Sequence, residues 1–203
     1  MIEPDQPLLE STVDPDPVRQ FTAWFDEAAS LMAAPEAMAV ATADGQGRPS
    51  ARMVLLKSWG PAGFVFFTNR DSRKGRELAV NPQASLLFHW DSSSRQVRIE
   101  GAVEWTDDAE SDAYFATRPR GSQVGAWASH QSQPAVGRPD LDRRVGAAEA
   151  EYQGRPVPRP PWWGGIRVVP GAFEFWQHRD NRLHDRIRYL PDGPGWRIER
   201  LQP

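Results

Sequence analysis

The chain has 203 residues, no cysteine and a formal net charge of −3 at pH 7. This length fits one domain, and the lack of cysteine excludes disulfides, thiolate nucleophiles and cysteine-ligated metal centres. The small net charge provides no general attraction to nucleic acid or anionic membranes, so any anion site must come from local groups. Because no apolar run could span a bilayer and the start lacks a signal-peptide pattern, we expect a cytoplasmic protein.

The first half of the chain predicts one helix followed mainly by strands. Residues 1–16 are rich in proline and aspartate, and we expect them to form a flexible segment. Asp16 and Pro17 then supply an N-cap and a first helical residue. Apolar residues at helical spacing and alternating residues with turn signals predict the following elements. They are a helix over 17–32, strands over 37–43, 50–57, 64–68, 84–90 and 96–105, and a helix over 71–81.

The second half predicts three short helices and then a return to strands. A helix after 106–108 carries Tyr114 and Arg118 on one face, and Pro119 ends it. The expected helices and strands are those over 122–129, 139–153, 166–169, 172–177, 182–189 and 196–201, with an extended proline-rich linker over 155–165. The antiparallel signals predict a mainly β, α+β domain over 17–203, a small β-barrel with helical inserts.

Residues 173–189 have the sequence FEFWQHRDNRLHDRIRY, and in the second half of this stretch apolar and basic residues alternate. Leu183, Ile187 and Tyr189 fall on one face of the expected strand, and the other face carries basic side chains. Those side chains are Arg182, His184, Arg186 and Arg188. Two interpretations remain open from the residues alone. The basic face is either solvated or directed at a planar, phosphorylated ligand.

Three further clusters could hold anions. Arg52 and Lys57 lie on opposite faces of one strand, and Arg73 and Lys74 open a helix whose N-terminus favours an anion. The third cluster consists of Tyr114, Arg118 and Ser122. A solvated surface explains each cluster equally simply, but together they indicate a phosphorylated cofactor and a phosphorylated substrate. No dinucleotide or mononucleotide phosphate loop is present, and the four histidines lack metal-ligand spacing, so we expect no metal.

Five strings resemble the pyridoxamine 5'-phosphate oxidase family. They are RMVLLK (52–57), FTNRDSRKGREL (67–78), RQV (95–97), YFATRPRGSQVGAWASHQS (114–132) and FEFWQHRDNRLHDR (173–186). The resemblance runs from about residue 17 to 203 in the same order. It implies a split β-barrel flavoprotein, a homodimer with C-terminal dimerisation hairpins, and FMN bound between the two subunits.

The resemblance also implies roles for individual residues. Arg52, Arg73 and Lys74 would hold the FMN phosphate. The rest of the FMN site would comprise Met53, Val54, Leu55, Leu56, Lys57, Phe67, Thr68 and Gln96, with Gln131, Ser132, Trp176 and Arg186 from the partner subunit. The substrate site would comprise Lys57, Tyr114, Arg118 and Ser122 on the phosphate, and Arg182, Leu183 and His184 at the pyridine ring. Arg182 and His184 are the expected catalytic residues.

The implied reaction transfers a hydride from C4' of pyridoxamine or pyridoxine 5'-phosphate to the flavin, which dioxygen reoxidises to give hydrogen peroxide. The chain departs from the family pattern in two places. Its start lacks the Arg and Tyr that many members place over the substrate, and Ala34 replaces a frequent acidic residue. Two alternatives stay open: a phenazine-biosynthesis type of flavin oxidase, and a non-catalytic protein that binds flavin or pyridoxal phosphate.

Overall fold

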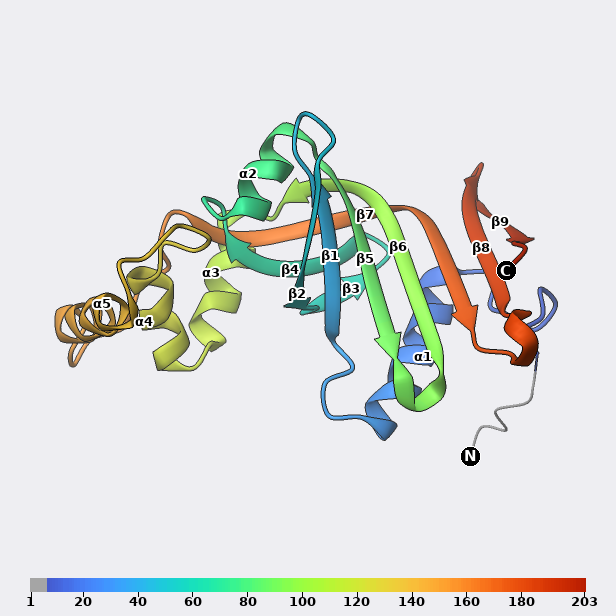
Figure 1. The fold of residues 1–203 in the computed structure, drawn as a ribbon, viewed down its shortest axis with the longest axis horizontal. Helices are drawn as coiled ribbons and strands as arrows, with labels where there is room; N and C mark the ends of the chain where they lie inside the picture. Colours follow the sequence, from blue (N-terminus) through green and yellow to red (C-terminus); the bar gives the residue numbers. More distant parts are fainter. Residues whose placement is uncertain (1–6) are drawn as a thin grey trace.

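The computed structural model describes residues 7–203 as one curled antiparallel β-sheet, a half-barrel, with helices around it (Figure 1). The sheet has the strand order β2-β1-β5-β6-β7-β4-β3, and β8 and β9 extend it from the far end of β7. The strands are β1 Ala37–Ala43, β2 Pro49–Leu55, β3 Ser58–Gly60, β4 Gly63–Asn69, β5 Gln83–Trp90, β6 Arg95–Trp105, β7 Trp163–Gln177, β8 Asp185–Asp192 and β9 Gly195–Arg200.

The helices begin at the capping residues that the sequence supplies. Asp16, Ser72 and Asp107 each accept a backbone N–H from the first turn of the helix that follows. The α-helices are α1 Pro17–Leu31, α2 Arg73–Val80, α3 Asp108–Thr117, α4 Arg120–Ala128 and α5 Arg138–Glu151, and the 3₁₀ turns are η1 Asp91–Ser93 and η2 Asp180–Arg182. None of the helices within residues 7–203 is long and apolar enough to cross a membrane.

Strand β7 organises the sheet because it pairs with three others. Its first half pairs with β4, its second half with β8, and β6 runs beside almost all of it. The register between β6 and β7 shifts at Glu100/Gly101. A Cβ on Gly101 would overlap the Val169 carbonyl oxygen, so only glycine permits this close approach. The bulge lets one strand curl from the helical end of the molecule to the β8 end (Figure 1).

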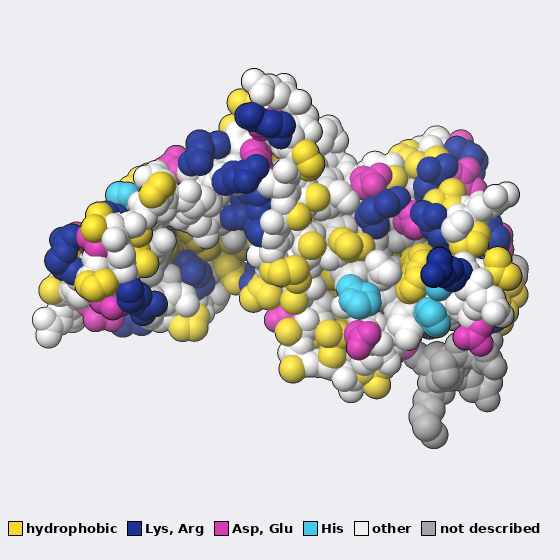
Figure 2. All heavy atoms as spheres, in the orientation of Figure 1, with side chains coloured by type: hydrophobic (Ala, Val, Ile, Leu, Met, Phe, Trp, Pro, Cys, Tyr) yellow, Lys and Arg dark blue, Asp and Glu magenta, His cyan; other side chains and the backbone are white. Residues whose placement is uncertain are grey.

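Two apolar clusters hold the fold together. The larger one fills the concave side of the sheet under α1, where Phe21 is fully buried and makes edge contacts with Phe64 and Phe88. The smaller one lies among α3, α4, α5 and the start of β7, and it includes Phe115 and Trp163. The outer face of the sheet stays partly apolar, and Figure 2 shows apolar surface over β1, β2 and β5.

Several predicted boundaries need correction. The expected strands over 166–169 and 172–177 are one continuous strand that begins at Trp163, inside the expected linker. The strand expected over 182–189 begins only at Asp185, because Asn181 and Arg182 have positive φ angles of 55° and 62°. Helix α4 begins at Arg120 rather than Ser122, and β3 was not predicted.

The N-terminal segment also differs from the expectation. Residues 1–6 lie outside the described residues, but residues 7–16 pack against β8 and β9 instead of forming the expected flexible lead-in. Leu8 is buried, and its backbone N–H donates to the carboxylate of Asp185 at 3.1 Å. The hydroxyl of the buried Tyr189 donates to the carbonyl oxygen of Asp14 at 2.8 Å. Apolar contact and buried hydrogen bonds therefore fix this segment locally.

Candidate functional site

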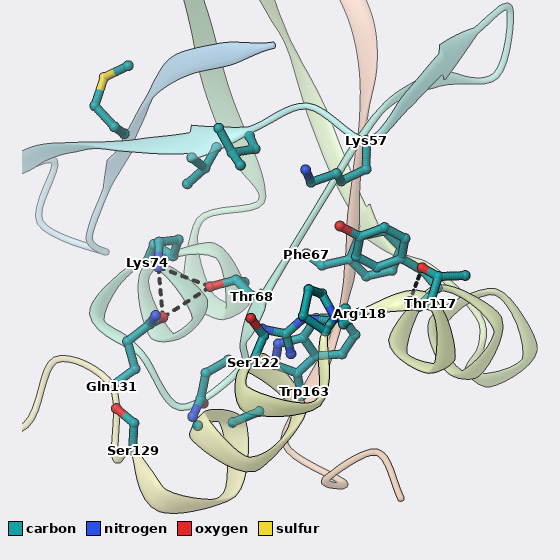
Figure 3. Close-up of a pocket in the computed structure, with 18 residues that line it drawn as sticks. Lys57, Phe67, Thr68, Lys74, Thr117, Arg118, Ser122, Ser129, Gln131 and Trp163 are labelled. Carbon is teal, nitrogen blue, oxygen red and sulfur yellow. Dashed lines mark hydrogen bonds between the residues drawn. The ribbon is translucent and has the colours of Figure 1, made fainter. Parts of the chain in front are cut away.

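A pocket of about 670 Å³ lies between the end of β2, strand β4 and the helices α2, α3 and α4 (Figure 3). It brings together eleven of the residues that the sequence assigned to cofactor or substrate. They are Met53, Val54, Leu55, Lys57, Phe67, Thr68, Lys74, Tyr114, Arg118, Ser122 and Gln131. Segments separated by more than 70 residues in the sequence therefore meet around one cavity, whose size suits a small organic ligand.

Strand β2 supplies one wall by simple alternation. Met53, Leu55 and Lys57 are exposed, whereas Arg52 is half-buried and Leu56 is buried. Leu56 therefore packs into the core, and its side chain does not line the pocket. Strand β2 is at the edge of the sheet, so one side of its backbone pairs with no other described strand.

Lys74 is the buried cation of the pocket. Its ammonium group donates to Thr68 Oγ1 at 3.0 Å and to Gln131 Oε1 at 2.9 Å, both neutral oxygens (Figure 3). No carboxylate of residues 7–203 forms an ion pair with it. Burial, and secondly the charge of Arg52, lowers the pKa of Lys74 from 10.5 to about 8. A buried ammonium without a counterion is the environment that an anionic ligand stabilises.

Arg52 and Arg73 lie beside Lys74 but share one carboxylate, Glu77. Arg73 Nε contacts Glu77 Oε1 at 2.8 Å, and Arg52 Nη2 lies 3.4 Å from Glu77 Oε2. Burial acts to raise the pKa of Glu77, but hydrogen bonds from Ser50, Thr42 and Arg73 outweigh it and lower that pKa to about 2. Glu77 therefore stays ionised and orients both arginines. Neither arginine lines the cavity directly.

The opposite end of the pocket combines stacked rings with a second cation. Phe67 stacks on Tyr114 at a ring-centre distance of 4.1 Å and on Trp163 at 5.2 Å, with interplanar angles of 15° and 9°. The Arg118 guanidinium lies 4.8 Å from the Trp163 ring centre. Its Nη1 is buried without a hydrogen-bond partner among the described residues. Burial lowers the pKa of Arg118, which also favours a ligand that brings negative charge.

Trp163 is the main residue that the sequence interpretation missed. It was placed in a surface linker, but it is only 6 % exposed and carries the cation–π contact with Arg118. The sequence signal that could have indicated close packing here is the pair Gly164-Gly165, which directly follows Trp163. A Cβ on Gly165 would lie 2.5 Å from Thr106 Oγ1, so close packing requires glycine there. The other lining residues that were not predicted are Asn69, Thr117, Pro119, Gly125, Ala126 and Ser129.

Gln131 and Ser132 were expected to act from the partner subunit. Gln131 instead reaches the pocket of its own chain, where its side-chain oxygen accepts from Lys74 and Thr68. Ser132 follows at a positive φ of 67°, is exposed and does not line the cavity. The loop after α4 therefore closes one side of the pocket within a single chain.

The remaining predicted residues lie at the far end of β7. Trp163 begins this strand beside the pocket, and Trp176 stands near its end, so the strand path between them is on the order of 40 Å. Gln96, Trp176 and Arg186 are direct cross-strand neighbours on the outer face. Arg182, Leu183 and His184 follow in the adjacent loop. None of these side chains lines the pocket of the same chain. The β8 end of strand β7 lies far from the helices α3 and α4 (Figure 1).

The loop at this far end has its own geometry. Arg182 is exposed and forms no ion pair within residues 7–203, and Leu183 is 69 % exposed. His184 is half-buried against Trp176, with a ring-centre distance of 4.7 Å. Arg186 donates to Glu174 Oε1 at 2.7 Å. Within the same described residues, no group of three histidine, aspartate or glutamate side chains is arranged to hold a metal ion.

Comparisons with known proteins cover nearly the whole chain. Residues 25–154 match the family described as "Pyridoxamine 5'-phosphate oxidase", and residues 163–203 match "Pyridoxine 5'-phosphate oxidase C-terminal dimerisation region". A relative from Rubrobacter xylanophilus, named pyridoxine/pyridoxamine 5'-phosphate oxidase, is 58% identical over 97% of this chain and 91% of its own. A relative of the same name from Cupriavidus taiwanensis is 58% identical over 97% and 93%.

Solved structures agree on the architecture. PhzG from Burkholderia lata, solved with tetrahydrophenazine-1-carboxylic acid, is 34% identical with a TM-score of 0.90, covering 98% of both chains. A pyridoxamine 5'-phosphate oxidase-related, FMN binding protein from Nostoc punctiforme has a TM-score of 0.74 at 16% identity, over 92% of this chain and 98% of its own. The second likeness supports the fold alone.

Proposed function

The chain belongs to the pyridoxamine 5'-phosphate oxidase family, and from this premise we propose that it oxidises pyridoxamine or pyridoxine 5'-phosphate to pyridoxal 5'-phosphate. Dioxygen is the acceptor and hydrogen peroxide the second product; the amine substrate also takes up water and releases ammonia. The protein is thus an oxidoreductase of vitamin B6 metabolism. We expect it in the cytoplasm, in keeping with a chain that has no cysteine.

The carrying observation is that one pocket holds a buried cation, Lys74, and a half-buried one, Arg118, neither of which forms an ion pair within residues 7–203. Lys74 lies beside Thr68 and Gln131, and Arg118 lies against the Trp163 ring (Figure 3). An oxidase of this family must hold two phosphates, one on the cofactor and one on the substrate. Charged hydrogen bonds to phosphate contribute about 1.5–3 kcal/mol each. Lys57 and Ser122 line the same cavity and would complete the substrate phosphate site.

The residues present fit a flavin, and FMN is the form that we propose. The buried ammonium of Lys74, backed by Arg52 and Arg73, would hold the FMN phosphate. The exposed β2 residues Met53 and Leu55 would cover apolar parts of the cofactor. When bound, the flavin supplies the two-electron acceptor that protein side chains lack. The side chains contribute binding, orientation and exclusion of water.

A homodimer would complete the site. Because Arg182 and His184 lie a whole strand away from the pocket of their own chain, we infer that they serve the pocket of the partner. The match of 163–203 to a dimerisation region and the partly apolar outer face of the sheet support this arrangement. Arg182, exposed and unpaired in the described chain, is then our candidate for the group that positions and polarises the reacting carbon.

A second candidate function, a phenazine-biosynthesis type of flavin oxidase, is suggested by the likeness to PhzG, whose structure was solved with tetrahydrophenazine-1-carboxylic acid. A substrate without phosphate would not need the cluster of Lys57, Arg118 and Ser122, so this candidate is less favoured. A binding protein without turnover is the remaining alternative.

The deciding assay is oxygen consumption by the purified protein with each phosphorylated vitamer, together with formation of the aldehyde. Arg118→Leu should raise the KM for pyridoxine 5'-phosphate about 10–100-fold, while the weak reaction of unphosphorylated pyridoxine should change little. Arg182→Leu should lower kcat severely and leave FMN bound. A yellow protein that is inert toward both phosphorylated vitamers would refute the oxidase and favour the binding protein or the phenazine type.

A further inference from the structure

Two hydroxyl groups connect the side chains of Arg52 and Glu77. Thr42 of β1 and Ser50 of β2 are direct cross-strand partners, so their hydroxyls lie side by side and face Glu77 of helix α2. Arg52 Nη1 donates to Thr42 Oγ1 at 2.6 Å, and Arg52 Nη2 donates to Ser50 Oγ. Both hydroxyls in turn donate to Glu77 Oε2, Ser50 at a distance of 2.6 Å.

The direction of these hydrogen bonds is fixed by the groups that make them. A guanidinium has only donors, so each hydroxyl accepts from Arg52 and must place its single proton elsewhere. An ionised carboxylate has only acceptors, and Glu77 receives both protons. Burial acts to raise the pKa of Glu77, but its hydrogen bonds lower that pKa to about 2, so the carboxylate is ionised at neutral pH. The two hydroxyls therefore bridge an ion pair whose direct contact is long, at 3.4 Å.

Glu77 uses its other oxygen to hold Arg73. Arg73 Nε contacts Glu77 Oε1 at 2.8 Å, one helical turn away on α2. Glu77 is the one carboxylate of residues 7–203 that pairs with either Arg52 or Arg73. Its side chain is buried, whereas the side chain of Arg73 is 57 % exposed and would otherwise move freely. One carboxylate thus fixes an arginine from the β1–β2 hairpin and an arginine from the start of α2.

From this geometry we propose that Glu77 is a positioning residue for the cofactor phosphate, and that Thr42 and Ser50 connect it to Arg52. The carboxylate holds both arginines in place before the ligand arrives, so binding does not have to order two flexible side chains. The inference rests on the proposed use of FMN. It goes further because it assigns part of the phosphate affinity to three side chains, Thr42, Ser50 and Glu77, that do not line the pocket.

The charge of Glu77 by itself predicts the opposite effect. Removing a negative charge beside the cations of the site would attract a phosphate more strongly. Positioning predicts weaker binding, because the side chain of glutamine has a single acceptor oxygen. That oxygen can serve the two hydroxyls or Arg73, but not both. The direction in which Glu77→Gln changes the affinity for FMN therefore separates a positioning residue from a competing anion.

Fluorescence titration of the full-chain apoprotein with FMN and with riboflavin tests the proposal. Glu77→Gln should bind FMN about 10–100-fold more weakly, and Ser50→Ala about 3–10-fold more weakly. Riboflavin has no phosphate and reports on the rest of the pocket, so its affinity should stay within about twofold of wild type. Equal losses for both ligands, unchanged FMN affinity, or tighter binding of FMN by Glu77→Gln would each overturn the proposal.

A double-mutant cycle tests the connection through the hydroxyls. If Ser50 acts through Glu77, Ser50→Ala should change FMN affinity less than about twofold when Glu77→Gln is already present. A second full loss in the double variant would overturn this connection. Where Glu77→Gln does not fold, Thr42→Val and Ser50→Ala decide the proposal with Glu77 intact, and unchanged FMN affinity in both would refute it.

Glu27→Gln is the matched control for stability. Glu27 pairs with Arg95 at 2.6 Å and does not line the pocket. This substitution should lower the urea midpoint as Glu77→Gln does but leave FMN affinity within about twofold of wild type. An equal loss of FMN affinity would show that destabilisation alone explains the effect and would overturn the proposal. A wild type that binds FMN but oxidises neither vitamer refutes the oxidase function and leaves this test intact, whereas a wild type that does not bind FMN overturns both.

Discussion

Replacing Lys74 with methionine should have opposite effects on the stability of the apoprotein and on its affinity for FMN. Lys74 is 6 % exposed, and its ammonium group has only neutral acceptors within the described chain. A buried charge without a counterion opposes folding, whereas an apolar side chain of similar length does not. Lys74→Met should therefore stabilise the apoprotein and weaken cofactor binding.

The magnitude follows from the pKa of Lys74. Burial lowers this pKa from 10.5 to about 8, so the charged Lys74 reduces the free energy of unfolding of the apoprotein by about 3 kcal/mol at neutral pH. Between pH 8 and 10.5 the unfolded chain binds a proton on Lys74 that the folded chain has lost, so apoprotein stability should rise with pH across this window. Methionine removes this destabilising charge but also removes the two hydrogen bonds of the ammonium group. The free energy of unfolding of the apoprotein should therefore rise by about 1–3 kcal/mol at pH 7.

Urea unfolding of both apoproteins at several pH values measures these effects. Lys57→Met is the matched control, because Lys57 lines the same pocket but is exposed, and its removal should leave stability unchanged. Fluorescence titration should show FMN bound about 10–100-fold more weakly by Lys74→Met, with riboflavin affinity unchanged. An apoprotein destabilised by the substitution, or an equal loss for riboflavin, would refute the reasoning.

Three further predictions concern binding and stability. Arg73→Ala should weaken FMN binding about tenfold or more, while Ser50, Thr42 and Arg52 continue to contact the buried Glu77 carboxylate; unchanged FMN affinity would contradict the role of Arg73. Gly101→Ala should lower the free energy of unfolding in urea by about 3 kcal/mol, because the new Cβ meets the Val169 backbone. A loss below about 0.5 kcal/mol would mean that the bulge relaxes easily. Tyr189→Phe should lower the free energy of unfolding by about 1 kcal/mol and speed proteolytic cleavage on the N-terminal side of Asp14. An unchanged cleavage rate would show that this hydrogen bond does not hold the N-terminal segment.

Local signals were sufficient for most elements. Caps act within one turn, so Asp16 predicted where α1 begins, and the helices expected over 71–81 and after 106–108 start at the observed caps Ser72 and Asp107. Alternation predicted most strands, since it depends only on which face is buried. The family resemblance also assigned eleven residues that the pocket brings together.

The errors arose where distant segments decide the conformation. Residues 1–16 look flexible in sequence, but Asp185 and Tyr189 hold 8–14 against the sheet. Trp163 looks like part of a linker, but pairing with β4 makes it the first residue of β7. In each case the stabilising partner lies far away along the chain.

The sequence by itself determined the family, the α+β class and the residue types that could bind phosphate, because these depend on composition, spacing and motif. The tertiary structure decided how those residues are divided. Strand β7 carries Trp163 at the pocket and Trp176 near the loop of His184, so one group of residues lies at each end of a rigid strand. Sequence order cannot reveal this separation, because it depends on how a single long strand pairs with β4, β6 and β8.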